Sequence, residues 1–418
     1  MGEAKTIPRA LSVDALRGFV LFTMLFVDDL GRASKHVVPA WMRHYEGASG
    51  MYFADVVLPA FLFMVGMSVP FALQGRVEKG EPLGKTLLHV GERTASLLLL
   101  GVIIVNGLAD SEMMGWSAEL WSVLTTLSAI LAFSAIKISR RSTPTRARLV
   151  SRLSTALRVV GLGALAALVF AFRGHDGHRI VSFSPFSIHA EWWGILGQIG
   201  WAYLTASLVY LVVRGRQAAL LVTTALLYCL YVADKKGLLG SFTLSPYLEV
   251  GESMGSQSAI AVLGLAVSTT VWQKSNEPTV AQNVRFALGL VAACGAAACA
   301  FQAKYVVSKD NATPPWALWS SSIMVALWLA LYLQSDARAA EVKASRAMTA
   351  LATAGQNVLL AYLLRDWVVA LLPFLHVDAL YQSLASGLPQ ALFRSVAWSF
   401  AIVFASTGLN RLGFLVKL

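Results

Sequence analysis

Three acidic residues and one histidine lie close together in the sequence, around the end of the first apolar segment. Asp28 and Asp29 end that segment, His44 lies in the polar stretch after it, and Asp55 begins the next apolar segment. We expect all four at one level of the protein, because the end of one segment and the start of the next lie on the same side. A histidine that a carboxylate orients can act as a general base. A helix cap at Asp55 and a plain surface position for His44 are the simpler alternatives.

Other polar residues that could contact a substrate lie later in the chain. His189 and Glu191 form a second candidate acid–base pair, and a pair of tryptophans that includes Trp193 follows them. Indole faces can stack on a sugar ring or anchor a protein at the membrane interface, and both interpretations stay open. Asn357 is an uncharged polar residue in an apolar segment, where it either joins helices or offers a donor to a substrate.

The beginning of the first apolar segment carries charges of its own. Arg17 follows Asp14 by three residues, so the two side chains can pair on one helix face. Arg9 and Arg17 could instead bind phosphate groups, to which guanidinium forks are well matched. At 1.5 Å per residue, about 21 Å of helix separates Asp14 from Asp28. One helix therefore carries charged residues at both ends of a possible site within the membrane.

The composition predicts that membrane-spanning helices position these residues. Of the 418 residues, 56% are hydrophobic and only 14% are charged, against about 25% charged in soluble domains. A helix needs about 20 mostly apolar residues to cross the hydrocarbon core, and such segments recur along the chain. We expect an all-α, polytopic bundle of about twelve helices that forms one domain over residues 1–418. The predicted helices are 11–29, 54–74, 86–107, 118–137, 157–172, 194–213, 217–233, 257–272, 286–304, 315–333, 348–372 and 390–411.

Lysines and arginines set the expected orientation. They cluster in the predicted loops 137–158 and 334–347 and are absent from 108–117. Because basic loops remain in the cytoplasm, both termini are expected there, and the loop 30–53 with His44 faces outward. Three basic residues within 30–53 count against this orientation. The same pattern accounts for the net charge of +11 without a nucleic-acid partner.

Several classes of chemistry lack their motifs. The sequence has no nucleotide-binding glycine loop, no zinc-protease motif and no serine-hydrolase elbow. The spacing of its three cysteines predicts neither a zinc site nor a disulfide. Pro59, Gly66 and Pro70 predict kinks in the second apolar segment, which would pack around a cavity. Either an enzyme or a transporter could use such a cavity.

Two stretches near the N-terminus have a specific pattern, Arg9-Ala-Leu-Ser-Val-Asp14-Ala-Leu-Arg17-Gly18 and Ala54-Asp55-Val-Val-Leu-Pro59-Ala-Phe-Leu-Phe-Met-Val-Gly66. With His44 between them, they resemble the heparan-α-glucosaminide N-acetyltransferase family and its bacterial relatives, which are transmembrane acyltransferases. Looser matches lie at 192–203 and 355–362. Asp28 stands where the family has asparagine. The run that begins at His44 also departs from the family's His-Ala-x-Trp-Asn-Gly.

The resemblance implies transfer of an acyl group, above all acetyl, from cytoplasmic acetyl-CoA to a hydroxyl or amine of a sugar or glycan on the periplasmic side of the inner membrane. It implies that His44 is the catalytic base and that Asp28 orients it or grips the acceptor. No metal is expected, the lipid bilayer is the surrounding partner, and a homodimer remains open. A transporter or flippase for a glycan or small solute is the alternative, and a structural or signalling membrane protein is a third. The remaining site predictions are Arg9 and Arg17 for CoA, and for the acceptor Asp29, Asp55, His189, Glu191, Trp193 and Asn357.

Overall fold

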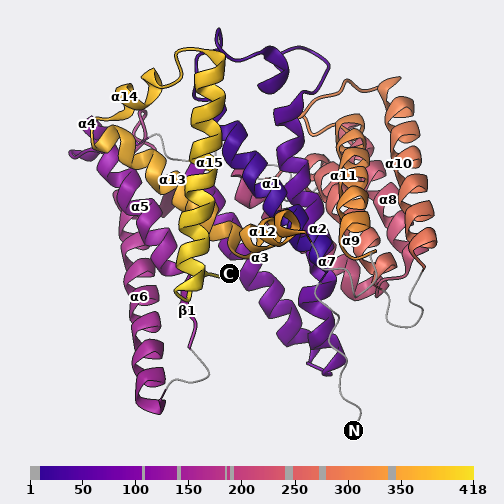
Figure 1. Ribbon diagram of the computed structural model, residues 1–418, viewed down its shortest axis with the longest axis horizontal. Helices are drawn as coiled ribbons and strands as arrows, with labels where there is room; N and C mark the ends of the chain where they lie inside the picture. Colours follow the sequence, from indigo (N-terminus) through magenta and orange to yellow (C-terminus); the bar gives the residue numbers. More distant parts are fainter. Residues whose placement is uncertain are drawn as a thin grey trace. The chain divides into compact units, whose positions relative to one another are not determined.

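The computed structural model describes residues 10–105, 109–138, 143–183, 186–188, 193–240, 248–272, 279–337 and 345–418 (Figure 1). The described chain is mostly helical, which confirms the predicted all-α, polytopic class. Within the described residues, ten helical segments are long and apolar enough to cross a membrane. They are Phe53–Glu78, Leu83–Val105, Pro144–Ala171, Gly194–Val213, Gln217–Lys235, Gly251–Val271, Val280–Gln302, Pro314–Gln334, Arg346–Phe374 and Leu388–Arg411.

Two further helices account for the rest of the predicted twelve. Helix α1 (Leu11–Leu30) carries charged residues near both ends, and α5 (Ala118–Ala132) has only 15 residues. Each of the twelve predicted segments coincides with a helical segment, and one, α7 (Gly194–Val213), agrees at both ends. The predicted loop 137–158 is wrong, because α6 (Pro144–Ala171) begins well before residue 157. Thr143 caps α6 through its hydroxyl and Pro144 occupies its first turn, so the basic stretch continues as helix.

The chain divides into two compact units by its contacts. The described residues of the first unit fall within Met1–Val20, Ala40–Ala95 and Gln198–Thr353. Those of the second fall within Leu21–Pro39, Ser96–Gly197 and Ala354–Leu418. The prediction of one functional domain over the whole chain stays a prediction.

The first unit is built around α9 (Ser258–Val271), which is buried along nearly its whole length and follows a π-helical turn, η3 (Gly251–Gln257). Helix α2 (Val57–Glu78) packs closely against it. A Cβ at Gly66 would lie 1.7 Å from the Ala261 carbonyl oxygen, and one at Gly264 would lie 2.1 Å from that of Phe63. Only glycine permits this approach, as is usual where membrane helices meet through small residues.

Other helices of the first unit surround this pair. Helix α8 (Gln217–Lys235) packs on α9 and η3, and α10 (Val280–Gln302) lies beside α11 (Pro314–Gln334), as Figure 1 shows. The Asn283 side chain donates a 2.9 Å hydrogen bond to the Tyr332 hydroxyl, which joins α10 to α11. The first unit also contains most of α3 (Leu83–Val105), the short η1 (Ala40–Met42) and η2 (Phe53–Val56), and α12 (Arg346–Ala354).

The second unit contains the end of α1 and the packed pair α5 and α6. The Trp121 indole donates to the Leu168 carbonyl at 2.9 Å, which links this pair. Helix α13 (Val358–Phe374) follows the turn η4 (Gly355–Asn357) and packs against α5 and α15 (Leu388–Arg411). The short helices are α4 (Ser111–Met114) and α14 (Asp378–Ser383). Two antiparallel pairs complete it, β1 (Ser134–Ile136) with β4 (Phe414–Val416) and β2 (Val181–Phe183) with β3 (Phe186–Ile188).

Candidate active site

His44 lies in an irregular segment of the first unit, between η1 and η2, and directly contacts Asp55. Its Nδ1 atom is 2.8 Å from the Asp55 Oδ1 atom. The His44 side chain is 52% exposed, whereas the Asp55 side chain is only 2% exposed. An ionised carboxylate can only accept hydrogen bonds, so the contact assigns the proton to Nδ1 and leaves Nε2 as an acceptor. A half-exposed imidazole in this tautomer can take a proton from a bound molecule.

The other carboxylate oxygen of Asp55 fixes its position. Oδ2 accepts hydrogen bonds from the backbone N–H groups of Tyr45 at 3.0 Å and Tyr52 at 2.9 Å. Since Tyr52 precedes η2 and Asp55 is its third residue, the carboxylate also caps this turn, as in a capping box. The indole of Trp316 on α11 donates to the Asp55 backbone carbonyl at 3.2 Å. Asp55 therefore does both: its Oδ2 atom caps the turn, and its Oδ1 atom contacts His44.

A third residue, Lys309, joins this pair from a distant part of the sequence. Its Nζ atom is 3.3 Å from His44 Nδ1 and 3.7 Å from Asp55 Oδ1. Two hydrogen bonds join the chain just before Lys309 to the chain just after His44. Gly50 N–H donates to the Val307 carbonyl at 2.9 Å, and Val307 N–H donates to the Ser49 hydroxyl at 3.1 Å. Sequence reasoning missed Lys309, since a single lysine in a short polar connection carries no signal of its own.

At the start of α1, Arg17 pairs with Asp14 as the spacing predicts. Its Nη1 atom is 3.0 Å from Asp14 Oδ1, and its Nη2 donates to the Ser68 hydroxyl of α2 at 2.5 Å. The Asp336 carboxylate accepts from the backbone N–H groups of Leu11 and Ser12, each at 3.0 Å, and so caps this helix end. Arg9 lies outside the described residues. The binding of CoA phosphates by Arg17 stays a prediction.

In the second unit, two arginines face the adjacent carboxylates at the end of α1. Asp28 Oδ2 is 3.2 Å from Arg365 Nη2, and Arg365 also pairs with Asp366, its neighbour on α13. Asp29 is buried and accepts from Arg394 Nε at 3.1 Å, from the Tyr381 hydroxyl and from the Ser395 hydroxyl. Two adjacent carboxylates at a helix C-terminus oppose the helix dipole, which favours positive charge there. Arginines from α13 and α15 supply that positive charge.

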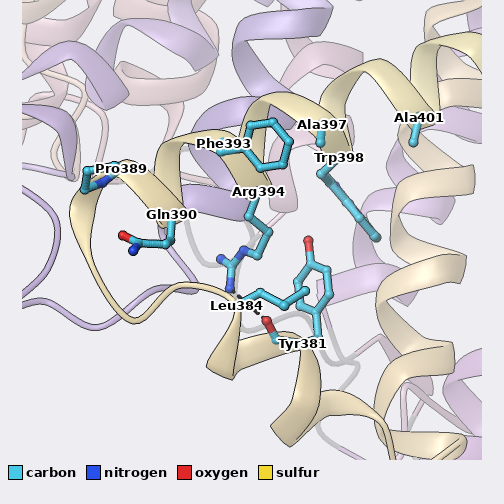
Figure 2. Close-up of a pocket in the computed structure, with 9 residues that line it drawn as sticks. All are labelled: Tyr381, Leu384, Pro389, Gln390, Phe393, Arg394, Ala397, Trp398 and Ala401. Atoms are coloured by element: carbon cyan, nitrogen blue, oxygen red, sulfur yellow. Dashed lines mark hydrogen bonds between the residues drawn. The ribbon is translucent and has the colours of Figure 1, made fainter.

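A cavity of about 730 Å³ lies beside the Arg394 network (Figure 2). Arg394 also donates to the Tyr381 backbone carbonyl, and its guanidinium lies 4.7 Å from the centre of the Tyr381 ring. Burial, together with the hydrogen bond to Asp29, raises the pKa of the Tyr381 phenol, so this hydroxyl remains a donor. The lining comes from α15, α14 and the turn between them: Tyr381, Leu384, Pro389, Gln390, Phe393, Arg394, Ala397, Trp398 and Ala401.

The remaining predicted site residues lie in other places. His189 and Glu191 lie outside the described residues, and Trp193 directly precedes α7. Asn357 is buried in η4, where its Oδ1 accepts from the Val416 N–H at 3.4 Å and so holds β4. Its Nδ2 has no hydrogen-bond partner among the described residues. The contacts of Asn357 are those of a residue that joins elements, and its role toward a substrate stays a prediction.

Comparison with known proteins gives a family model and two curated relatives. Residues 9–188 match a family described as a domain of unknown function, DUF5009. Human heparan-alpha-glucosaminide N-acetyltransferase is 32% identical over 99 residues, which are 24% of this chain and 14% of the human protein. The mouse protein of that name is 33% identical over 98 residues, 23% of this chain and 14% of its own length. The chain thus matches only a small part of these relatives, and the resemblance predicted from the sequence is confirmed at that level.

Proposed function

We propose that the chain is a membrane acetyltransferase that moves an acetyl group from acetyl-CoA to a hydroxyl or amine of a sugar or glycan. The contact between His44 Nδ1 and Asp55 Oδ1 supports this most directly, because it leaves the other nitrogen of a half-exposed imidazole to accept a proton. The similarity to two N-acetyltransferases supports the class of reaction.

His44 acts as the base in the proposed reaction. Its Nε2 takes the proton from the acceptor hydroxyl or amine as the acceptor atom attacks the thioester carbonyl. The carbon–sulfur bond then breaks, the acetyl group remains on the acceptor, and CoA leaves as a thiolate. The imidazolium returns its proton to the departing sulfur. Asp55, which already accepts from Nδ1, stabilises the imidazolium while the positive charge exists.

The remaining residues have roles in substrate binding under this proposal. Acetyl-CoA comes from the cytoplasmic side, with its phosphates near Arg9 and Arg17. The acceptor binds on the periplasmic side of a bacterial inner membrane, and Asp28 is one of its proposed contacts. The other proposed acceptor contacts are Asp29, Asp55, His189, Glu191, Trp193 and Asn357.

The experiment is a transfer assay with purified full-length protein in lipid nanodiscs. Radiolabelled acetyl-CoA is mixed with a panel of amino sugars and neutral sugars, and labelled product is separated from the donor. His36→Ala is the matched control for His44→Ala, because His36 is exposed and lies a few residues earlier. Product that depends on His44 and not on His36 supports the proposal. Protein that binds sugar or carries it across vesicles without labelled product contradicts it.

A further inference from the structure

Lys309 lies outside residues 9–188, the part matched by the family model, yet its side chain contacts both His44 and Asp55. We propose that Lys309 is a positioning residue of this site: its ammonium holds the Asp55 carboxylate and offsets the charge of that carboxylate beside the His44 imidazole. The catalytic consequence of this role rests on the proposed function. The effect on the protonation of His44 can be measured without it.

The three groups form a small triangle. His44 Nδ1 is 2.8 Å from Asp55 Oδ1 and 3.3 Å from Lys309 Nζ, and the ammonium is 3.7 Å from the same carboxylate oxygen. A neutral imidazole nitrogen either donates or accepts, so Nδ1 cannot bond to both partners at once. The shorter contact belongs to Asp55, which can only accept. Lys309 therefore acts on the imidazole through its charge and through its hold on Asp55.

The backbone around Lys309 is built to keep the ammonium in this place. Ser308 and Thr313 close a ring, in which Thr313 N–H donates to the Ser308 carbonyl and Ser308 N–H donates to the Thr313 hydroxyl, each at 3.0 Å. Within the ring, Ala312 N–H donates to the Lys309 carbonyl at 3.0 Å. Ala312 has a φ of 41°, a conformation that side chains other than glycine adopt rarely and at a cost.

The same segment contacts Asp55 a second time, at its backbone. Trp316 follows the ring on α11, and its indole donates to the Asp55 backbone carbonyl. One stretch of chain therefore fixes both Asp55 and the cation beside it. Two hydrogen bonds between Val307 and the segment that contains His44, one donated by each side, hold the third member of the triangle.

The charges around His44 explain why a cation matters. Asp55 and Lys309 contact the imidazole directly. Asp310 lies 3.6 Å from Lys309, and Arg43 and Glu46 pair with each other on the segment that contains His44. A buried carboxylate alone favours the protonated imidazolium, which cannot act as a base. The ammonium opposes that proton at close range, because like charges disfavour each other. Lys309 thus leaves Asp55 as an orienting group and keeps Nε2 available.

The test measures the protonation of His44 through its reaction with diethyl pyrocarbonate, which modifies neutral imidazole but not imidazolium. Full-length protein is treated briefly over a range of pH, and the His44 peptide is quantified by mass spectrometry against the His36 peptide of the same sample. Lys309→Met and Lys309→Gln remove the charge, and Lys309→Arg keeps it. Lys304→Met is the matched control, since it removes the same charge from an exposed lysine nearby in the sequence.

We expect the pH at which half of His44 is modified, the modification midpoint, to rise by about one pH unit in both neutral variants. Two unit charges at this separation repel each other by about that much even in water. The midpoint stays within a few tenths of a pH unit in Lys309→Arg and Lys304→Met. An unchanged midpoint in a folded neutral variant overturns the proposal, as does an equal shift in Lys304→Met. If one neutral variant fails to fold, the other decides.

Acyl transfer provides the second measurement. If the protein transfers acetyl groups, the acid limb of its kcat/KM profile moves with the modification midpoint in the neutral variants. A shifted midpoint in a protein that transfers nothing to any acceptor refutes the proposed function and leaves the role of Lys309 intact. A normal midpoint with active transfer refutes the role of Lys309 alone.

Discussion

Replacing Asp55 with asparagine removes one negative charge from the centre of the candidate site at nearly constant shape. The asparagine oxygen can still accept from the N–H groups of Tyr45 and Tyr52. The amide NH₂ then faces His44 Nδ1 and donates to it, so the imidazole must carry its proton on Nε2. The base is lost through the wrong tautomer. We expect a fall in kcat of about 10²–10⁴-fold, the range of a general base and of the analogous substitution in serine proteases.

The same substitution should leave the fold intact. Hydrogen bonds to a charged group are worth about 1.5–3 kcal/mol and neutral ones about 0.5–1.5 kcal/mol. Weakening the two backbone bonds of Asp55 therefore costs about 2 kcal/mol in Asp55→Asn. Asp55→Ala leaves both N–H groups without an acceptor, at about 1–3 kcal/mol each, and also leaves a gap. The two variants should have similar residual activity, while Asp55→Ala unfolds at a clearly lower temperature.

The assay is initial-rate transfer with purified protein, accompanied by thermal unfolding followed by intrinsic fluorescence. Asp310→Asn is the matched control, because Asp310 also contacts Lys309 but its side chain is 80% exposed. It should retain activity within a few fold. Transfer by Asp55→Asn at the wild-type rate would refute the orienting role of Asp55. An Asp55→Asn protein that does not fold would show that the carboxylate is needed for structure first.

Three further outcomes are expected. Arg17→Ala should weaken CoA binding about tenfold in calorimetry, whereas full recovery in an Asp14/Arg17 charge swap would show that the pair is only structural. Trp193→Ala should raise the acceptor KM several-fold with kcat little changed, and an unchanged KM with loss of protein from the membrane would leave only an anchoring role. Gly66→Ala should lower the unfolding temperature sharply, since overpacking costs about 1–3 kcal/mol or more. Gly75→Ala on the same helix should not, because the added Cβ would meet open space there.

The positions of the helices could be read from the sequence because membrane length and apolar composition determine them. Helix α7 agrees at both ends, since polar or turn residues bound its apolar run on each side. The start of α6 was missed, because hydropathy alone does not distinguish a basic helical stretch from a loop. Thr143 and Pro144 begin a helix there. Caps and helix propensity act on residues that need not be apolar.

The candidate site was predicted only where its members are close in sequence. His44 and Asp55 are separated by one short segment, so sharing a membrane level was enough to bring them together. The partners that complete each cluster come from far along the chain: Lys309 beside His44, Arg365 beside Asp28, and Arg394 beside Asp29. Each is a single basic residue, and only the packing of helices determines which acid it meets.

His44→Ala tests the central claim most directly. The variant, the wild type and His36→Ala are purified in nanodiscs, checked for folding and for binding of acetyl-CoA, and assayed for acetyl transfer over a range of pH. The account predicts that His44→Ala folds and binds acetyl-CoA, yet transfers at least about 10²-fold more slowly. It also predicts that the remaining activity lacks the acid limb that an imidazole base produces. Near-normal transfer by His44→Ala would contradict the account, and His189 would then be the first residue to replace.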